Sequence, residues 1–318
     1  MNQRLSDKKI LVLGGNGFIG SHLVDALIEN GYSVKLFDRP NTVFLGGINA
    51  LNVEMIYGDL NSEADIAAAV VGCDICFHLI STVVPASSNM DPIFDIETNL
   101  IGTVKLLNHA VKAGLKKIIF LSSGGTVYGV PTQLPIDENH PTNPLCSYGI
   151  TKLAIEKYLH LYQQLYGLDY TVLRLANPFG ERQRIHATQG AVAVFLGKAL
   201  RNEKIEIWGD GSVVRDYIHI SDVVTAMLSS MTYNGSERIL NIGSGHGISL
   251  NEVLDGIELV TGNKVARCYT PQRAFDVPIS VLAIDRAVNA LNWKPDTTFI
   301  TGLTHTIGYL ERNVEGMS

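Results

Sequence analysis

The sequence predicts an α/β protein, with a Rossmann-type, doubly wound parallel sheet and a smaller C-terminal substrate-binding lobe. Strand-like runs alternate with helical patterns through the first two thirds of the 318 residues. That alternation is typical of a parallel sheet covered by helices on both faces. A glycine-rich turn follows the first strand, as in dinucleotide-binding folds. The pattern loosens after Gly180, which predicts the second lobe.

The predicted elements follow in order along the chain. Apolar runs predict sheet strands at residues 8–13, 32–37, 53–58, 73–79, 116–121, 169–175 and 238–243. Helices are predicted over 18–30, 95–113, 145–167 and 250–262, with Asn143 capping the third, Pro144 at its first position and Ser249 capping the fourth. Residues 205–220 read as a strand, a Gly-Asp-Gly turn and another strand. We place a dinucleotide-binding domain at 1–178, with a late strand and helix from 214–243, and the lobe at 179–213 and 244–318.

Composition excludes several classes of protein. A net charge of -6 argues against a nucleic-acid partner, and no apolar run approaches the roughly 18 residues of a membrane span. The N-terminus lacks an apolar signal core, so we expect a cytoplasmic protein. Cys73 and Cys76 have metal-like spacing, but no second pair completes a tetrahedral set. We therefore expect core cysteines and no metal site.

The first strand and helix enclose a dinucleotide fingerprint. Gly14, Gly17 and Gly20 have G-x-x-G-x-x-G spacing, and Phe18 and Ile19 lie between the last two. Glycines permit a tight turn and let backbone amides reach a pyrophosphate at the helix N-terminus. The fingerprint predicts a dinucleotide cofactor.

The end of the second strand indicates which dinucleotide binds. Asp38 follows Gly20 at the distance expected of a carboxylate that accepts from a ribose 2'-hydroxyl, and it would repel the 2'-phosphate of NADP. NAD is therefore predicted, although the neighbouring Arg39 could pair with such a phosphate. Asp59 and Leu60 end the next strand, where Asp59 either bonds the adenine amino group or starts a helix.

Tyr148 and Lys152 are candidates for acid-base chemistry. They are four residues apart on a predicted helix, so both side chains emerge on one face. An ammonium beside the phenol would lower the pKa of Tyr148 from about 10 toward neutrality and make it a general base. An ordinary surface helix is the alternative, and the glycine fingerprint favours catalysis.

With these motifs in order, the chain resembles the extended short-chain dehydrogenases/reductases, and among them the nucleotide-sugar epimerases. The resemblance rests on "GGNGFIG", "SSGGTVYG", "YGITK", "RLANPFGERQ", "WGDGSVVRDYIHISDV" and "QRAFDVP". It implies NAD-dependent epimerisation at C4 of a UDP-hexose or UDP-N-acetylhexosamine. Tyr148 would remove the 4-hydroxyl proton while NAD takes the C4 hydride, and the hydride would return to the opposite face of a 4-keto sugar. A homodimer is also implied.

The resemblance carries further roles to this chain. It implies that Asn99 orders the active-site backbone and that Ser122 lies at the cofactor. Arg215 and Arg273 would grip the pyrophosphate, unless they are surface arginines paired with Asp216 or Asp276. The remaining residues implied to meet the substrate are Asn177, Asp276 and Ser280. Ser280 is small where epimerases restricted to plain hexoses have tyrosine, which implies that N-acetylhexosamines are accepted.

The loop after the fifth strand departs from the family pattern. Epimerases commonly have a serine that helps the tyrosine at the position of Gly124. Ser123 or Thr126 must then supply the hydroxyl, unless Tyr148 works without one. We favour Thr126, because it lies two residues from Gly124 on an alternating backbone, with Ser123 bonding the cofactor or Tyr148.

Two alternative functions remain. A 4,6-dehydratase or decarboxylase of the family would carry a carboxylate in the loop where this chain has Gly124, Gly125 and Thr126, so epimerisation is favoured. A non-catalytic NAD-sensing protein would have no reason to keep Tyr148 and Lys152 together.

Overall fold

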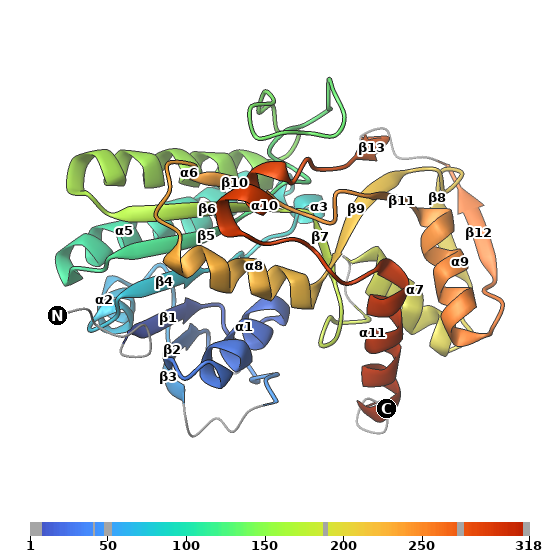
Figure 1. Ribbon diagram of the computed structural model, residues 1–318, viewed down its shortest axis with the longest axis horizontal. Coiled ribbons are helices and arrows are strands. Elements are labelled where there is room, and N and C mark those ends of the chain that lie inside the picture. The colour runs from blue at the N-terminus through green and yellow to red at the C-terminus, as the bar shows by residue number, and fades with distance from the viewer. Residues whose placement is uncertain (1–7, 41, 48–52, 187–189, 272–276, 314–318) are drawn as a thin grey trace.

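The computed structural model describes residues 8–40, 42–47, 53–186, 190–271 and 277–313, and its largest part is a seven-stranded parallel sheet (Figure 1). The strands lie in the order β10-β6-β5-β4-β1-β2-β3. Their bounds are β1 Lys9–Leu13, β2 Ser33–Asp38, β3 Val53–Tyr57, β4 Ile75–His78, β5 Lys117–Ser123, β6 Asp169–Leu175 and β10 Ile239–Ile242. The chain runs outward from β1 to β3 and then outward in the other direction from β4. The strand order therefore reverses between β1 and β4, where doubly wound sheets bind ligands at the carboxyl ends of their strands.

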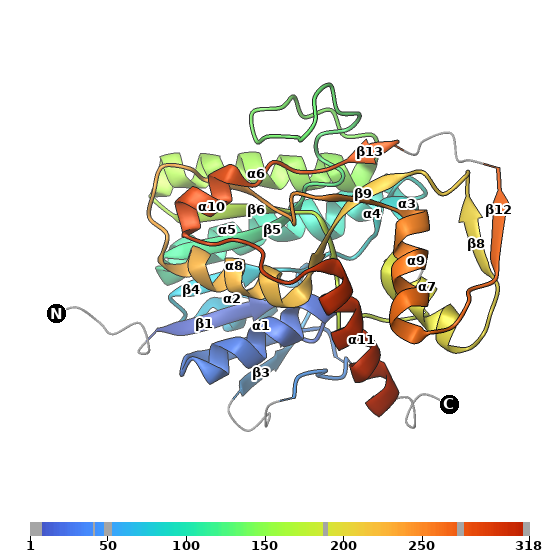
Figure 2. The same cartoon turned by 45° about the vertical axis from the view of Figure 1, so that its right-hand side comes forward.

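Helices cover both faces of this sheet (Figures 1 and 2). One face carries α1 Phe18–Glu29, α8 Ile220–Thr232 and α10 Asp285–Leu291, and the other carries α2 Glu63–Val70, α5 Gly102–Ala113 and α6 Ser147–Tyr166. Alternate residues of each strand enter opposite cores, because side chains alternate across a strand. Ile10 and Val12 of β1 belong to the core beneath α1 and α8, whereas Leu11 and Leu13 belong to the core beneath α5 and α6. Burial on both faces explains why these strands read as continuous apolar runs.

The helix predicted over 95–113 is interrupted at its start. Two short helices, α3 Pro85–Ser88 and α4 Pro92–Asp95, lead into a π-helical turn, Ile96–Ile101, which continues as α5. π-helical turns are rare in proteins, and those that occur often lie at functional sites. The helix ends as predicted at Ala113, where Gly114 adopts a left-handed conformation with φ of 73°.

The smaller lobe has its own sheets and core. β9 Val214–His219 pairs with β7 Asn177–Phe179, β11 Gly247–Ser249 and β13 Ile279–Ser280, and β8 Ile205–Trp208 pairs with β12 Arg267–Thr270. The covering helices are α7 Ala191–Leu200, α9 Leu250–Thr261 and α11 Phe299–Asn313. The two strands predicted within 205–220 exist, but they join different sheets. Ser249 caps α9 as predicted, because its hydroxyl accepts the Glu252 N–H at 3.2 Å.

The predicted start of α6 is wrong. The helix begins at Ser147, so Asn143 and Pro144 lie before it. Contacts from distant residues determine this start: the Ser147 N–H donates to Asn89 Oδ1 at 2.8 Å, and the Ser147 hydroxyl donates to Asp95 Oδ2 at 2.7 Å. A local capping rule cannot detect such partners.

Across the described ranges, no helix is both long enough and apolar enough to cross a membrane.

Candidate active site

The turn between β1 and α1 forms a cradle of glycines. Gly14 has a φ of 84°, a conformation that favours glycine. A Cβ at Gly20 would lie 2.2 Å from the Gly14 carbonyl oxygen, so a side chain there would force the turn apart. No side chain caps α1 at Gly17, and its first turn contains no acidic residue. The cradle therefore fits a pyrophosphate, because the first turn of α1 holds no acidic side chain and its amides and dipole favour an anion. Phe18 and Ile19 pack against the core below.

Asp38 connects this turn to the end of β2. Its Oδ2 accepts the Asn16 N–H at 2.9 Å, and its Oδ1 accepts the Arg39 N–H at 2.8 Å. The carboxylate is thereby fixed beside the glycine cradle, at the position suited to a ribose hydroxyl. A hollow opens here, lined by Arg39, Pro40, Tyr57, Gly58, Asp59 and Asp65.

Asp59 does not cap α2, because the hydroxyl of Ser62 accepts the Asp65 N–H at that position. The Asp59 carboxylate instead accepts the Asn61 N–H at 2.8 Å at the edge of the hollow. Leu60 is buried and lies under Gly102, where a Cβ would come within 3.0 Å of it. The helix-start interpretation of Asp59 is thus wrong.

Tyr148 and Lys152 lie in the first turns of α6, at the carboxyl end of β5. Lys152 is buried and its Nζ donates to the Leu121 carbonyl oxygen at 3.0 Å. The same Nζ lies 5.6 Å from the Tyr148 ring centroid and 4.7 Å from the Phe120 ring centroid. The two side chains share one face of the helix, as the spacing predicts.

The pKa of Tyr148 differs from the sequence-based expectation. Burial raises it to about 12, and the nearby Asp95 adds to the rise, while hydrogen bonds with Ser123 and Ser81 lower it. Burial likewise lowers the pKa of Lys152 to about 8, although Asp95 raises it. Lys152 does not lower the pKa of Tyr148 as expected, because the Lys152 Nζ is directed to the Leu121 carbonyl oxygen and not to the phenol.

The hydroxyls after β5 have separate environments. Ser122 donates to the buried Glu156 at 2.6 Å, so its hydroxyl proton is already engaged. Ser123 is the residue of this loop whose hydroxyl lowers the pKa of Tyr148 through a hydrogen bond, as Ser81 does from the loop after β4. Thr126 Oγ1 is buried and makes no hydrogen bond with the part of the chain that is described. At Gly124, a Cβ would lie 2.6 Å from Leu282 Cδ1, so a serine there would displace Leu282.

A buried carboxylate that sequence reasoning missed organises the site. Asp95 accepts hydrogen bonds from Ser147 at 2.7 Å, Thr151 at 3.1 Å and Asn99 at 2.9 Å. Asn99 in turn accepts the Thr82 N–H at 3.0 Å, which holds the loop after β4. Asn99 thus contacts the backbone of the loop after β4 from the π-helical turn. The only sequence signal for Asp95 was its place at the start of a predicted helix.

A second buried network lies beneath the face of α6 that carries Tyr148 and Lys152. Arg174 Nη2 donates to Glu156 Oε2 at 2.6 Å, and both side chains are almost fully buried. The Arg174 guanidinium lies 4.8 Å from the Tyr128 ring centroid, and the Tyr128 hydroxyl donates to Asn241 at 2.6 Å. The network joins α6 to three neighbouring segments of the fold.

The predicted substrate residues converge along β9. Ser280 pairs with Arg215 across the sheet, and Ser280 is buried. Arg215 Nη1 donates to the Val277 carbonyl oxygen at 2.7 Å. Asn177 donates to the Asp216 carbonyl oxygen at 3.1 Å. Arg273 and Asp276 lie outside the described residues.

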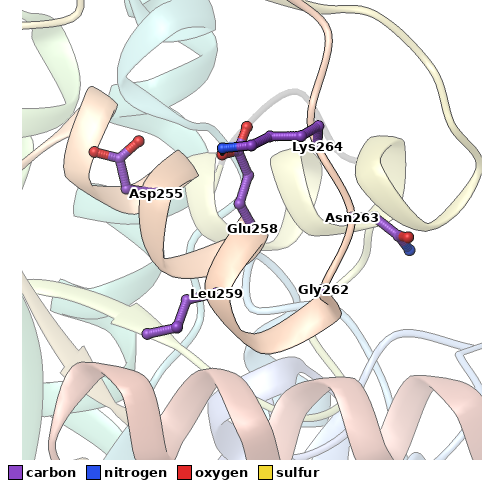
Figure 3. A pocket seen from close by; sticks show the side chains of 6 residues that line it. All are labelled: Asp255, Glu258, Leu259, Gly262, Asn263 and Lys264. Atoms are coloured by element: carbon purple, nitrogen blue, oxygen red, sulfur yellow. The ribbon is translucent and has the colours of Figure 1, made fainter.

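Another hollow lies away from this site, at the C-terminal end of α9 (Figure 3). Its lining is Asp255, Glu258, Leu259, Gly262, Asn263 and Lys264. Glu258 is paired with Lys264 at 2.8 Å and with Arg267 at 3.1 Å. The charged groups Glu258 and Lys264 of this hollow are therefore paired within the protein.

Comparison with known proteins agrees with the geometry. Residues 10–243 match the NAD dependent epimerase/dehydratase family. A putative UDP-glucose 4-epimerase of Methanocaldococcus jannaschii is 37% identical, over 96% of this chain and 99% of the relative. The UDP-glucose 4-epimerase of Thermotoga maritima, solved with UDP-glucose, is 38% identical with a TM-score of 0.91, covering 96% of this chain and 99% of that one. A UDP-N-acetylglucosamine 4-epimerase from Methanobrevibacter ruminantium, in complex with UDP-N-acetylmuramic acid, is 29% identical with a TM-score of 0.91, covering 96% and 99%.

The glycine cradle, the Tyr148–Lys152 pair and these similarities lead to one assignment. The chain belongs to the NAD-dependent epimerase/dehydratase family, as an extended short-chain dehydrogenase/reductase of the UDP-sugar epimerase kind with NAD as its cofactor.

Proposed function

We propose that the protein interconverts UDP-hexoses that differ in configuration at C4, and that it also accepts the corresponding UDP-N-acetylhexosamines. The observation that carries this proposal is the placement of Tyr148, on α6, at the carboxyl ends of the strands that also carry the NAD cradle. The names of the relatives support it, because they include both a UDP-glucose and a UDP-N-acetylglucosamine 4-epimerase.

Each residue of the pair has a role that its position supports. NAD, when bound, supplies the acceptor and the donor of the C4 hydride. Tyr148 takes the proton of the 4-hydroxyl as C4 is oxidised and returns it after the 4-keto sugar has turned over. Lys152, one helical turn away, stabilises the phenolate once its ammonium is drawn from the Leu121 carbonyl oxygen. Burial raises the pKa of Tyr148 to about 12, so this role of Lys152 is needed for Tyr148 to act as the base.

The helping hydroxyl is best supplied by Ser123. Its hydrogen bond to Tyr148 supports this role, whereas Thr126 Oγ1 is enclosed by protein. The sequence favoured Thr126 for this role, whereas we now propose Ser123.

The remaining substrate roles rest on position. Arg215 lies on β9, and the strands that pair with β9 carry Asn177 and Ser280. This arrangement supports a nucleotide-sugar site along β9. Arg273 and Asp276 are proposed from the family resemblance alone. The loop after β5 has no carboxylate between Gly124 and Thr126, which favours epimerisation over 4,6-dehydration or decarboxylation.

The test is product analysis by NMR after incubation with UDP-glucose, UDP-galactose and their N-acetylated counterparts in deuterated buffer. We expect each sugar to yield its C4 epimer with no solvent deuterium at C4, because the same hydride returns. A 6-deoxy-4-keto product would identify a dehydratase, and release of carbon dioxide from UDP-glucuronic acid would identify a decarboxylase. Unchanged sugars with bound NAD would favour the NAD-sensing alternative.

Substrate breadth gives a prediction at Ser280. Because this side chain is buried beside Arg215, a tyrosine at this position would fill space next to the sugar. Ser280→Tyr should lower kcat/KM for the N-acetylated sugars by about tenfold or more while the plain hexoses change little, since the loss is steric. Ser280→Ala is the matched control and should preserve both activities. Equal loss on both substrate classes would remove Ser280 from this role.

We also propose a homodimer formed through α5 and α6. These helices contact each other on one face of the sheet (Figures 1 and 2), and the face of α6 turned away from the core carries large apolar side chains. They are Ile150, Tyr158, Leu161 and Leu165, with exposed fractions of 38 to 61%. A second copy of the same helix pair can cover this stripe by two-fold symmetry, because an isologous interface is self-complementary.

Leu161→Glu with Leu165→Glu should therefore halve the mass measured by light scattering after gel filtration, from twice the 34.6 kDa of the chain to that of one chain. Two carboxylates would be desolvated at the interface, and that burial is strongly unfavourable. Leu259→Glu is the control, because Leu259 is 70% exposed on α9, away from the stripe. A dimer that survives the double substitution places the interface elsewhere.

A further inference from the structure

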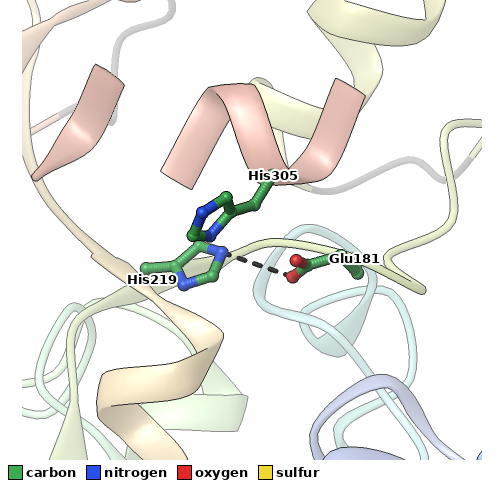
Figure 4. Close-up of side chains that lie close together, drawn as sticks. All are labelled: Glu181, His219 and His305. Carbon is green, nitrogen blue, oxygen red and sulfur yellow. Dashed lines mark ion pairs between the residues drawn. The ribbon is translucent and has the colours of Figure 1, made fainter. Parts of the chain in front are cut away.

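Three potential metal ligands from separate elements converge beside α11 (Figure 4). Glu181 follows β7, His219 ends β9, and His305 lies on α11. Their ligand atoms all lie within 4.8 Å of one another. None of these elements carries Tyr148 or Lys152, so the cluster is not part of the proposed catalytic pair.

The spacing of the cluster matches a tetrahedral ion. Zinc bonds to histidine and carboxylate ligands are about 2.0–2.2 Å long, which places neighbouring ligands roughly 3.4 Å apart. His219 Nε2 and Glu181 Oε2 are already 3.3 Å apart. His305 is exposed and adjoins the His219 ring, with 5.7 Å between the ring centroids, and its ligand atom lies within 4.8 Å of the other two.

The surroundings of His219 are those of a positioned ligand. The residue is 2% exposed, and its buried Nε2 makes no hydrogen bond with the described residues although it faces Glu181. Its Nδ1 lies 2.8 Å from the Ser221 hydroxyl, which in turn contacts Thr297 at 3.0 Å. The Ser221 N–H donates to Nδ1 at a longer 3.4 Å. Binding of an ion at Nε2 would place the ring proton on Nδ1, where the Ser221 hydroxyl at 2.8 Å would accept it in place of this weaker contact.

The charges near the cluster leave room for a cation. The neighbouring Arg182 is directed to Asp25, with 2.6 Å between Nη2 and Oδ2. The Arg182 guanidinium thus has its own carboxylate partner.

We propose that Glu181, His219 and His305 bind one zinc ion, with water at the fourth position because His305 faces solvent. The ion would bind the Nε2 lone pair of His219, with the ring proton on Nδ1. It would link α11 to the ends of β7 and β9, and because the unfolded chain lacks this geometry, binding would stabilise the folded state. The site would be structural, independent of the proposed epimerisation.

The experiment uses the full-length protein stripped with EDTA, dialysed and titrated with zinc chloride. We expect about one zinc per chain by elemental analysis, and a melting temperature that rises with zinc. His305→Asn and Glu181→Gln should weaken the zinc affinity by about tenfold or more and abolish the rise in melting temperature. His160→Asn is the matched control, an exposed histidine on α6 outside the cluster, and should behave like wild type.

Cobalt substitution separates this site from the partly exposed Cys146 and Cys268. Four-coordinate cobalt at the cluster should give a visible band without thiolate charge transfer in the near ultraviolet, and His305→Asn should remove the band. The proposal is overturned if zinc stays far below one per chain, if the cobalt spectrum shows thiolate ligation, or if His305→Asn binds zinc as wild type does. His305→Asn remains informative if Glu181→Gln fails to fold, because His305 is exposed.

Discussion

Tyr148→Phe is expected to lower kcat by about 10²–10⁴-fold, the range that a positioned general acid-base group contributes. The phenyl ring preserves the packing at the start of α6 and removes only the hydroxyl that exchanges a proton with the sugar. NAD should remain bound, because the glycine cradle and Asp38 belong to β1, α1 and β2 and not to α6. Turnover with each UDP-sugar, and the NAD content of the purified variant, are the two measurements.

The dependence on pH gives this prediction a second readout. The base must lose a proton, and burial has raised the pKa of Tyr148 to about 12 in the ligand-free protein. In wild type, kcat/KM should therefore rise with pH up to about 8, where Lys152 begins to lose the ammonium that stabilises the phenolate, and the residual activity of Tyr148→Phe should lose this rise. A variant within a few fold of wild type would show that another group is the base.

The loop hydroxyls supply the matched comparison. Ser123→Ala removes the hydrogen bond that lowers the pKa of Tyr148, so it should reduce turnover more than Thr126→Val does. Thr126→Val instead removes a buried hydroxyl that has no hydrogen-bond partner in the described structure, and it should leave stability unchanged or raised. The reverse order of damage would return the helping role to Thr126.

The large sheet and the glycine turn could be predicted from the sequence because their signals are local. Strands buried on both faces appear as apolar runs, and the turn demands glycine at fixed positions, as the φ of 84° at Gly14 shows. The short strands β7 and β13 could not be found this way, because three and two residues carry no usable period and depend on β9 for their pairing. The start of α6 was missed for the same reason: Asn89 and Asp95 fix it from distant parts of the chain.

The candidate site was only partly visible in the sequence. Spacing on one helix revealed Tyr148 and Lys152, but their pKa values depend on burial and on the direction of the Lys152 side chain, which spacing does not specify. Asp95 became recognisable only from its three side-chain donors. We expected no metal site because the cysteine spacing was incomplete. Cysteine spacing carries no information about a cluster whose histidines lie far apart in the sequence, on β9 and α11.

Arg174→Met should destabilise the fold by about 3–5 kcal/mol, because it leaves the carboxylate of Glu156 buried without its cation. Both side chains of this pair are nearly inaccessible, at 3% for Arg174 and 1% for Glu156. Methionine has a similar reach and no charge, so the packing against Tyr128 is largely kept while the ion pair is lost. Urea unfolding followed by circular dichroism measures the free energy. Arg201→Met is the control: Arg201 contacts Glu203 at a similar 2.7 Å, but this exposed pair should contribute nothing measurable.

The double variant Glu156→Gln with Arg174→Met separates the ion pair from simple loss of packing. Glutamine removes the buried charge yet can still accept the hydroxyl of Ser122, which Glu156 binds at 2.6 Å. The double variant should therefore be more stable than Arg174→Met alone, since neutralising an unpaired buried charge relieves its desolvation cost. If Arg174 acted only through its volume, adding Glu156→Gln would give no recovery. Such a result would also mean that the Glu156 carboxylate already has other compensation, and that the network beneath α6 does not depend on its guanidinium.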